Sequence, residues 1–431
     1  MSGEPNRVSR VSHVGAHGGY PFGAGRGGAS SGRCIRRPLS TLLSTPKAAP
    51  MTDDVETPAI RLRGVSKRFP GAKEDAVAAM DLDVDRGSIV ALIGPSGCGK
   101  TTTLRMINRL IEPSAGTIEI EGRDVTNQPA MELRRGIGYV IQQVGLFPHR
   151  TIAANIATVP RTLGWEKARI DDRVRQLADV VGIDTSMLSR YPDELSGGQQ
   201  QRVGVARALA ADPPVLLMDE PFGAVDPIVR GRLQEELLDL QREVRKTIVL
   251  VTHDLDEAVK VADRIALLNV GGVVEQYASP DELLRAPANG FVEEFVGEDR
   301  SMRRLALATV GDLPYEPGPV IDITADPAAG LAVIDEHRTD WLGLVDDEVF
   351  LGWVPREELV GGRALADAER HLPAAQVAPS STLRSALEII MTSRTSVAVI
   401  NDDGRFRGTV TLERIRAGLA GVLDGPAERA A

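Results

Sequence analysis

The sequence contains little cysteine and no long apolar run, which argues against a disulfide-stabilised protein and against a membrane-spanning one. Only Cys34 and Cys98 occur in 431 residues, so a disulfide framework cannot form, which suits a reducing cytoplasm. No segment reaches the run of about 18 apolar residues that a membrane-spanning helix needs. The N-terminal region also lacks the apolar segment of about 7–15 residues that a secretory signal requires. With 42% hydrophobic residues, a chain of this length is expected to form two or three globular domains.

Positive charge is scarce outside the N-terminal region. The net charge of the chain is −10, but residues 1–50 hold seven Lys and Arg and one Glu, so the remaining residues carry −16. Nucleic acid binding requires a basic surface. We therefore expect no nucleic-acid partner.

Residues 1–57 mix Gly, Ser, Arg and Pro without apolar periodicity, so we expect a disordered extension. Their basic, Ser-rich composition resembles an organellar transit peptide, although the amphipathic pattern of such peptides is missing. Alternatively, translation starts at Met51, because the sequence MTDDVE leads directly into the patterned region. Composition favours the start at Met51.

The segment from Gly94 to Thr101 indicates a phosphate-binding loop. Its sequence, GPSGCGKT, fits G-x-x-x-x-G-K-[ST] and follows an apolar run that predicts a buried strand. Glycines without Cβ atoms let successive N–H groups point inward as an anion nest, which the next helix N-terminus continues. Lys100 supplies a charge for the β- and γ-phosphates, and the Thr101 hydroxyl suits Mg²⁺. The alternative is a glycine-rich turn with a solvated lysine.

Two carboxylates follow another apolar run. The sequence VLLMDE, from Val215 to Glu220, predicts a strand covered on both faces of a parallel sheet, which places Asp219 and Glu220 at the edge where the phosphate loop lies. Asp219 is suited to hold Mg²⁺ through its hydration shell, and Glu220 to orient or deprotonate an attacking water. Two further predicted strands end in Gln142 and His253. The order of these strand ends indicates phosphoryl chemistry at one sheet edge.

Between about Val144 and Arg190 the pattern becomes helical and polar, and the clearest amphipathic segment is WEKARIDDRVRQLADVVGI. We expect a helical insertion outside the sheet. It ends at the sequence LSGGQQQR, where Ser196 can cap a helix and the paired glycines leave N–H groups uncovered.

Together these segments resemble the ATP-binding cassette (ABC) ATPases over about 240 residues, from Ala59 to Glu298. Five motifs stand in the order of that family: Walker A (GPSGCGKTT), the Q-loop at Gln142, the signature (LSGGQQQR), Walker B (VLLMDEP) and the H-loop at His253. The segment GAVDP places Asp226 at the D-loop, with valine where leucine is usual. The resemblance implies an α/β P-loop cassette with a helical subdomain over residues 58–298.

The resemblance also implies ATP and Mg²⁺ as cofactors, bound at the seam of a head-to-tail homodimer. The implied ATP-binding residues are Phe69, Gly94, Pro95, Ser96, Gly97, Cys98, Gly99, Lys100, Thr101, Thr102, Ser196, Gly197, Gly198, Gln199 and Asp226. The implied Mg²⁺ ligands are Thr101, Gln142 and Asp219, and the implied catalytic residues are Glu220, His253 and Gln142. Phe69 would stack on the nucleobase, unless it only packs in the core.

Within this family, the sequence resembles the ATPase subunits of importers for quaternary amine osmoprotectants, namely glycine betaine, carnitine or choline. This resemblance depends mainly on the stretches RMINRLIEPSAGTI and RRGIGYVIQQVGLFPH. Such subunits work with separate transmembrane permease subunits, docked at the helical insertion, and with an extracellular or periplasmic solute-binding protein. We therefore expect a peripheral protein on the cytoplasmic face of the inner (plasma) membrane. The alternatives are an importer of another small solute, or a soluble ABC ATPase outside transport.

The C-terminal third repeats one plan of helix, strand, acidic turn and strand, over residues 301–360 and 370–425. The second copy resembles a cystathionine-β-synthase (CBS) domain, and we expect a smaller α/β CBS pair. Such domains usually hold adenosyl ligands with a Thr or Ser followed three residues later by Asp. Here Thr411 is followed by Arg414, and the first repeat has Pro355 and Glu358, which argues against nucleotide binding. Residues 301–431 contain 13 Arg, no Lys and 20 acidic residues, so the pair is either a salt sensor or a non-sensing dimerisation module. In a rival hypothesis, the pair is the working part and the cassette only a scaffold.

Overall fold

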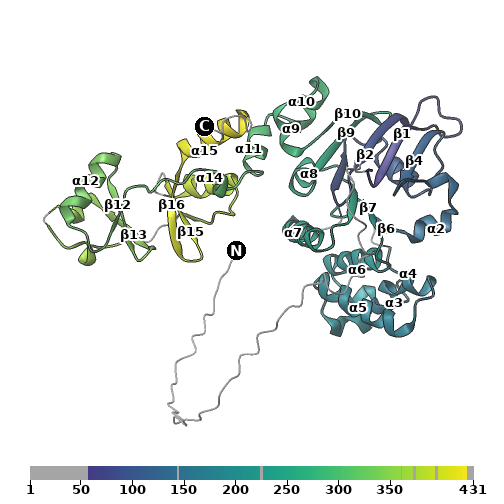
Figure 1. Ribbon diagram of the computed structural model, residues 1–431, viewed down its shortest axis with the longest axis horizontal. Coiled ribbons are helices and arrows are strands. Elements are labelled where there is room, and N and C mark those ends of the chain that lie inside the picture. The colour runs from purple at the N-terminus through teal and green to yellow at the C-terminus, as the bar shows by residue number, and fades with distance from the viewer. Residues whose placement is uncertain are drawn as a thin grey trace, which may run out of the picture. The chain divides into compact units, whose positions relative to one another are not determined.

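The computed structural model describes residues 57–142, 145–223, 227–360, 362–371, 375–393 and 397–424 (Figure 1). Residues 1–56 of the predicted extension and Asp226 lie outside these ranges. Across the described ranges, no helix is both long enough and apolar enough to cross a membrane.

A four-stranded antiparallel sheet begins the folded chain. Leu62 lies opposite Leu82 on one side and Ile118 on the other, so the three buried side chains form one apolar row, as the predicted strand alternation requires. In spatial order the strands are β2 (Val77–Val84), β1 (Ile60–Lys67), β4 (Ala115–Ile120) and β5 (Arg123–Asp124).

A six-stranded sheet forms the centre of the same region. Its strands run parallel except β10, which pairs antiparallel with β9. Strands β3, β7 and β8 are buried at every position because both faces of the sheet are covered. In spatial order the strands are β10 (Val273–Ala278), β9 (Arg264–Asn269), β3 (Ile89–Ile93), β8 (Thr247–Val251), β7 (Val215–Asp219) and β6 (Ile137–Val140).

The helices fall into two groups. The predicted helical insertion is present, and α5 buries Ile170, Val174 and Leu177 at the spacing of one helical face. It comprises α3 (Ile152–Ile156), α4 (Thr158–Thr162) and α5 (Lys167–Val180), and the chain continues into α6 (Gly197–Leu209). The other helices of this region are α1 (Lys100–Ile107), α2 (Ala130–Arg135), α7 (Pro227–Val244), α8 (Leu255–Val261), α9 (Pro280–Arg285) and α10 (Gly290–Val296).

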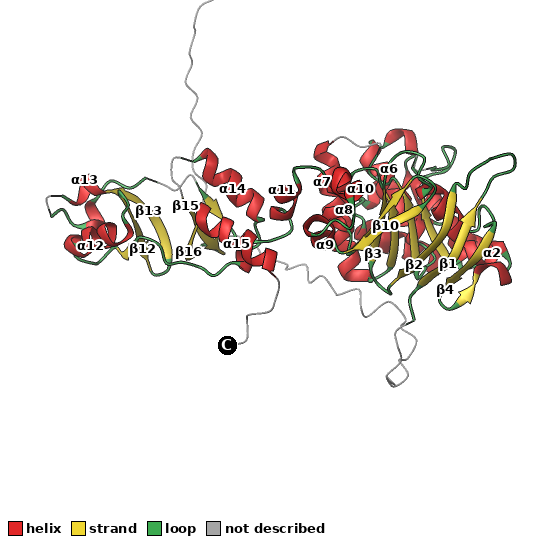
Figure 2. Cartoon of the chain, turned by 90° about the horizontal axis from the view of Figure 1, so that it is seen from above, coloured by secondary structure: helices red, strands yellow, loops and turns green. Residues whose placement is uncertain are grey.

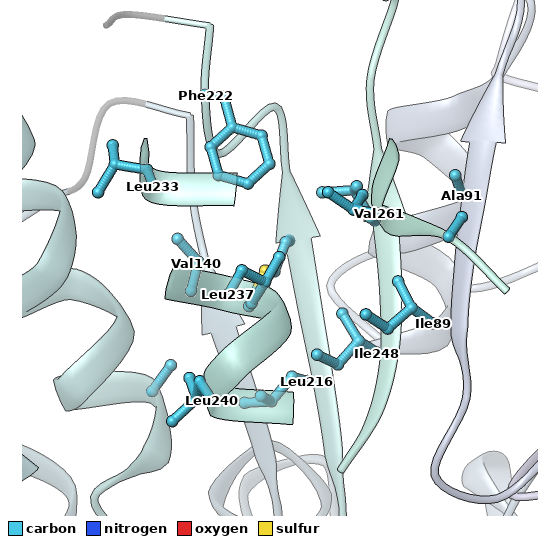
Figure 3. Close-up of a cluster of buried hydrophobic side chains, with 14 of the residues drawn as sticks. Ile89, Ala91, Val140, Leu216, Phe222, Leu233, Leu237, Leu240, Ile248 and Val261 are labelled. Carbon is cyan, nitrogen blue, oxygen red and sulfur yellow. The ribbon is translucent and has the colours of Figure 1, made fainter. Parts of the chain in front are cut away.

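Strand β3 separates two hydrophobic clusters, because its side chains point alternately to opposite faces. Ile89 and Ala91 enter a cluster with the helices, whereas Val90 and Leu92 enter a cluster shared with the antiparallel sheet. Figure 3 shows the first cluster, in which α7 contributes Leu237. The central strands are therefore held from both sides.

The C-terminal region, which follows α11 (Arg300–Leu305), contains one β-α-β-β-α unit twice (Figure 2). In both copies the register slips at the same place, between Leu344 and Val345 and between Ile400 and Asn401. The first copy comprises β11 (Val320–Asp322), α12 (Pro327–His337), β12 (Trp341–Asp346), β13 (Val349–Pro355) and α13 (Arg356–Leu359). The second comprises β14 (Gln376–Val377), α14 (Leu383–Thr392), β15 (Val397–Asp402), β16 (Arg405–Thr411) and α15 (Leu412–Asp424).

The two copies exchange edge segments. Glu316, which precedes the first copy, pairs with Thr409 in β16 of the second. His371, which precedes the second copy, pairs with Trp353 in β13 of the first. In each case a backbone N–H of the strand donates to the carbonyl oxygen of the segment at 2.8 Å. Each sheet is therefore extended at its edge by the segment that leads into the other copy.

The exchange depends on a glycine at the equivalent position of each strand. Gly352 and Gly408 have φ angles of 145° and 149°, and an added Cβ would lie 2.9 Å from the His371 oxygen and 2.6 Å from the Glu316 oxygen. Gly404 also has a positive φ, of 85°, but a Cβ there meets nothing within 4 Å.

We expect Gly408→Ala to destabilise the C-terminal region by about 3 kcal/mol, because backbone strain and a clash with the exchanged segment add. The control Gly404→Ala keeps only the backbone strain and should cost about 1 kcal/mol. Calorimetric unfolding of the full chain measures both. Equal costs for the two variants would contradict the role of the exchanged edge.

Candidate active site

The phosphate loop joins β3 to α1 and encloses a lysine. Gly94 has a φ of 143°, and a Cβ there would lie 2.1 Å from the Leu268 carbonyl oxygen, so only glycine fits where the chain leaves β3. The buried Lys100 Nζ donates to the carbonyl oxygens of Gly94 at 2.7 Å and Pro95 at 2.9 Å. Cys98 is also buried, with Sγ 3.6 Å from that Nζ. The loop therefore presents a positive charge at the N-terminus of α1.

The end of β7 brings a carboxylate to this loop. The Thr101 hydroxyl donates to Asp219 Oδ1 at 3.0 Å, and Asp219 is 7% exposed. Burial raises the pKa of the Asp219 carboxyl, while the Thr101 hydrogen bond and the charge of Arg105 oppose that rise. Two hard oxygens at the phosphate loop, one on a desolvated carboxyl group, fit Mg²⁺.

Among the described residues, no group of three or more His, Cys, Asp or Glu side chains is placed to hold a metal ion. Mg²⁺ is usually bound by one or two carboxylates together with phosphate oxygens and water. Thr101 and Asp219 would be the protein contribution to such a site.

Glu220 lies where three strand ends meet. Its φ of 46° falls in the left-handed region, which is uncommon outside glycine, and its N–H donates to the Val251 oxygen at 2.9 Å. Its carboxylate accepts a hydrogen bond from Gln142 Nε2 at 2.7 Å and lies 3.5 Å from His253 Nδ1. The structure thus brings together the three residues predicted to be catalytic.

A pocket of about 460 Å³ opens beside the loop and Glu220. It is lined by Ala76, Ser96, Gly97, Gly99, Lys100, Thr101, Thr102, Glu220 and His253. A loop of N–H donors and a lysine can bind phosphates there, with a carboxylate placed to orient a water. Ala76 was not predicted, because a single alanine ahead of a strand carries no chemical signal in the sequence.

Other predicted binding residues are not among those that line this pocket. Phe69 is 41% exposed, and the Lys67 ammonium lies 5.4 Å from its ring centroid, so stacking of Phe69 on a base stays a prediction. Ser196 caps α6 as predicted: its hydroxyl accepts from the Gln199 N–H at 3.4 Å, and Gln199 Oε1 accepts from the Ser196 N–H at 2.9 Å. Asp226 is outside the described residues.

Comparison with known proteins covers both folded regions. The family model for the ABC transporter matches residues 77–223, and the model for the CBS domain matches residues 370–421.

Two curated relatives are similar to most of the chain, and one solved structure is similar to more than half of it. The osmoprotectant import ATP-binding protein OsmV of Salmonella typhimurium is 48% identical over 366 residues, which cover 83% of this chain and 95% of that protein. The glycine betaine/carnitine/choline transport ATP-binding protein OpuCA of Bacillus subtilis is 50% identical over 309 residues, which cover 71% of this chain and 81% of that protein. The structure of cbiO1 from Clostridium perfringens, part of the ABC transporter complex cbiONQ, has a TM-score of 0.51 and 25% identity, and covers 58% of this chain and 96% of that chain.

We expect Asp219→Asn to raise the midpoint of thermal unfolding in metal-free buffer by about 2–4 °C, because it removes a carboxylate whose charged form is penalised by burial. A raised pKa means that the folded state binds the proton more tightly than the unfolded state, so wild-type stability should gain on the variant as pH falls toward that pKa. Scanning calorimetry at several pH values measures both effects. A lower midpoint for Asp219→Asn at neutral pH would contradict the desolvation argument.

Proposed function

Because the chain belongs to the ATP-binding proteins of ABC transporters that import osmoprotectants, we propose that it hydrolyses ATP to energise uptake of a quaternary amine such as glycine betaine, choline or carnitine. The observation that carries the proposal is the similarity to an osmoprotectant import protein over most of both chains. Subunits of this kind are peripheral to the membrane, and we place this one on the cytoplasmic face, where ATP is available.

Five side chains in or next to the pocket have a proposed task in hydrolysis. The loop N–H groups and Lys100 bind the β- and γ-phosphates, and Thr101 and Asp219 hold Mg²⁺, which supplies charge neutralisation at the phosphates. Glu220 orients the attacking water and accepts its proton, and His253 donates a hydrogen bond to the γ-phosphate. Their placement around one pocket supports these tasks.

Gln142 has a double role in this proposal. Its amide nitrogen donates to the Glu220 carboxylate, so it orients the base, and its amide oxygen is suited to contact Mg²⁺ or the water. Because Gln142 closely follows β6, a displacement of that strand would alter the hydrogen bond to Glu220.

We further propose that two copies meet head to tail, with Ser196, Gly197, Gly198 and Gln199 of one copy at the pocket of the other. The capping bond of Ser196 goes to the Gln199 N–H, so the N–H groups of the glycines form the outer N-terminus of α6. A Cβ at Gly197 would meet nothing within 4 Å in its own chain. Packing within one copy therefore gives no reason for glycine there, whereas close approach to a phosphate of the opposite copy does.

The proposed partners are separate transmembrane permease subunits and a solute-binding protein outside the membrane. A groove of about 280 Å³ supports docking at the helical insertion, because it is lined by Phe147 and Thr158 of the insertion, by Tyr139 of β6, and by Arg134 and Arg135 of α2. A permease segment in this groove would contact the strand that leads to Gln142. Docking would thereby be connected to the hydrolysis site.

We expect Lys100→Ala to weaken MgATP binding at least about tenfold, since the phosphates lose a buried cation. Glu220→Gln should bind MgATP like the wild type, lose turnover about 100-fold or more, and accumulate as a dimer when ATP is present. Nucleotide titration, phosphate release and size-exclusion chromatography measure these outcomes. The exposed Glu243→Gln serves as control, and wild-type turnover of Glu220→Gln would remove that residue from its proposed role.

In vesicles that contain the chain with the membrane and solute-binding proteins that copurify with it, we expect ATP-dependent uptake of glycine betaine, choline or carnitine. The same vesicles with Glu220→Gln should show no uptake, because hydrolysis drives the transport cycle. Spermidine serves as a cationic control that should not be carried. If the vesicles take up another solute but not glycine betaine, choline or carnitine, the proposed substrate class is disproved and the ATPase assignment stays intact.

A further inference from the structure

The start of α8 determines where His253 lies. The His253 side chain is 67% exposed, so packing does not hold it. Its neighbours are anchored instead: the buried Thr252 hydroxyl donates to Glu257 Oε2 at 2.6 Å, and the Asp254 N–H donates to that hydroxyl at 3.1 Å. Asp254 also caps α8 by accepting from the Asp256 N–H at 2.8 Å. A shift of the first turn of α8 would therefore move His253.

Arginines from two other helices contact that turn. Arg230 of α7 lies 3.6 Å from Asp254 Oδ2 and 3.5 Å from Glu257 Oε1. Arg303 of α11 donates from Nε to Asp256 Oδ1 at 2.6 Å. The turn thus carries three carboxylates, and it is contacted by one guanidinium from within the cassette and one from the helix that follows the cassette.

Two hydrogen bonds hold the Arg303 guanidinium, one from Nε to Asp256 and one from Nη1. Its Nη1 donates to the Val296 carbonyl oxygen at 2.6 Å, at the C-terminus of α10, and its side chain is only 22% exposed. The neighbouring Arg304, which is 5% exposed, donates to Asp281 of α9 at 2.9 Å. A partly buried guanidinium with two charge-assisted or carbonyl bonds holds its partners more firmly than an exposed surface ion pair does.

We propose that Arg303 is a positioning residue for ATP hydrolysis. Through Asp256 it holds the first turn of α8, and thereby it sets the place of His253 relative to Glu220. Arg303 does not line the pocket, so it acts through α8 and not on the nucleotide. The inference rests on the proposed function, because it requires His253 and Glu220 to act at the γ-phosphate.

The same short helix also reaches the C-terminal region. Leu305, the last residue of α11, is 2% exposed and belongs to a hydrophobic cluster with Val310, Leu383 and Ile390. One end of α11 is therefore buried in the second CBS copy, while Arg303 binds α8. A movement of that copy would reach His253 through this contact.

We expect Arg303→Gln in the full chain to lower kcat for MgATP about three- to tenfold, the range typical of an indirect coupling residue. KM should change by less than about twofold, because no contact to ATP is lost. Arg303→Lys, which keeps the charge opposite Asp256 but not both guanidinium hydrogen bonds, should recover only part of the lost kcat. Phosphate release at varied MgATP separates kcat from KM, and a purely structural role would move the unfolding midpoint instead.

The matched control is Arg300→Gln, which removes the same charge from α11 but breaks only a 3.4 Å ion pair to Glu293 of α10. Its kcat should equal that of the wild type. Asp256→Asn, at a side chain that is 62% exposed, should fold normally and reproduce the loss of Arg303→Gln, with no further loss in the double variant.

Two results would overturn the inference: unchanged kcat in both Arg303→Gln and Asp256→Asn, or an equal loss in Arg300→Gln. If Arg303→Gln does not fold, Asp256→Asn decides alone. Failure of the proposed function is seen separately, because Glu220→Gln would then keep its turnover. An inactive Glu220→Gln together with a fully active Asp256→Asn would refute only the role of Arg303.

Discussion

Parallel pairing of β3, β8 and β7 is the constraint on which the site depends. Asp219 lies opposite Val251, and Leu92 lies opposite the same residue on the other side, so the strand ends are level. Because these strands are buried on both faces, a change of register would drive loop residues into the core or leave apolar side chains uncovered. This register keeps the phosphate loop and the two carboxylates at one edge of the sheet, whereas the place of His253 also depends on the first turn of α8.

Glu220 shows how the site uses this rigidity. A left-handed backbone costs about 1–2 kcal/mol for a residue with a Cβ. It persists here because the Glu220 N–H bonds to β8 while its carboxylate contacts Gln142 after β6 and His253 after β8. The contacts of Glu220 therefore depend on the relative positions of β6 and β8. A contact that shifts His253, such as that of Arg303 with α8, therefore acts on the same carboxylate.

The fold class could be predicted from the sequence, and the comparisons confirm an α/β P-loop cassette followed by a smaller CBS region. Prediction succeeded where chemistry stands at the end of an apolar run, as at Asp219, because local pattern and parallel pairing then decide the location. It could not place Ala76 at the pocket or decide whether Phe69 stacks on a base, since the path of the loop before β2 depends on packing. The pair of Arg303 with Asp256 joins charged residues 47 positions apart, which leave no periodic signal.

The exchanged edges of the C-terminal region determine how it can be divided. Because the first sheet is closed by His371 and the second by Glu316, neither copy is an independent folding unit. Proteolytic cleavage or a premature stop between them would leave bare strand edges, which are templates for β-pairing between molecules. The two copies are therefore expected to be gained or lost together when the region is truncated, because either copy alone would expose the strand edge that the other now covers.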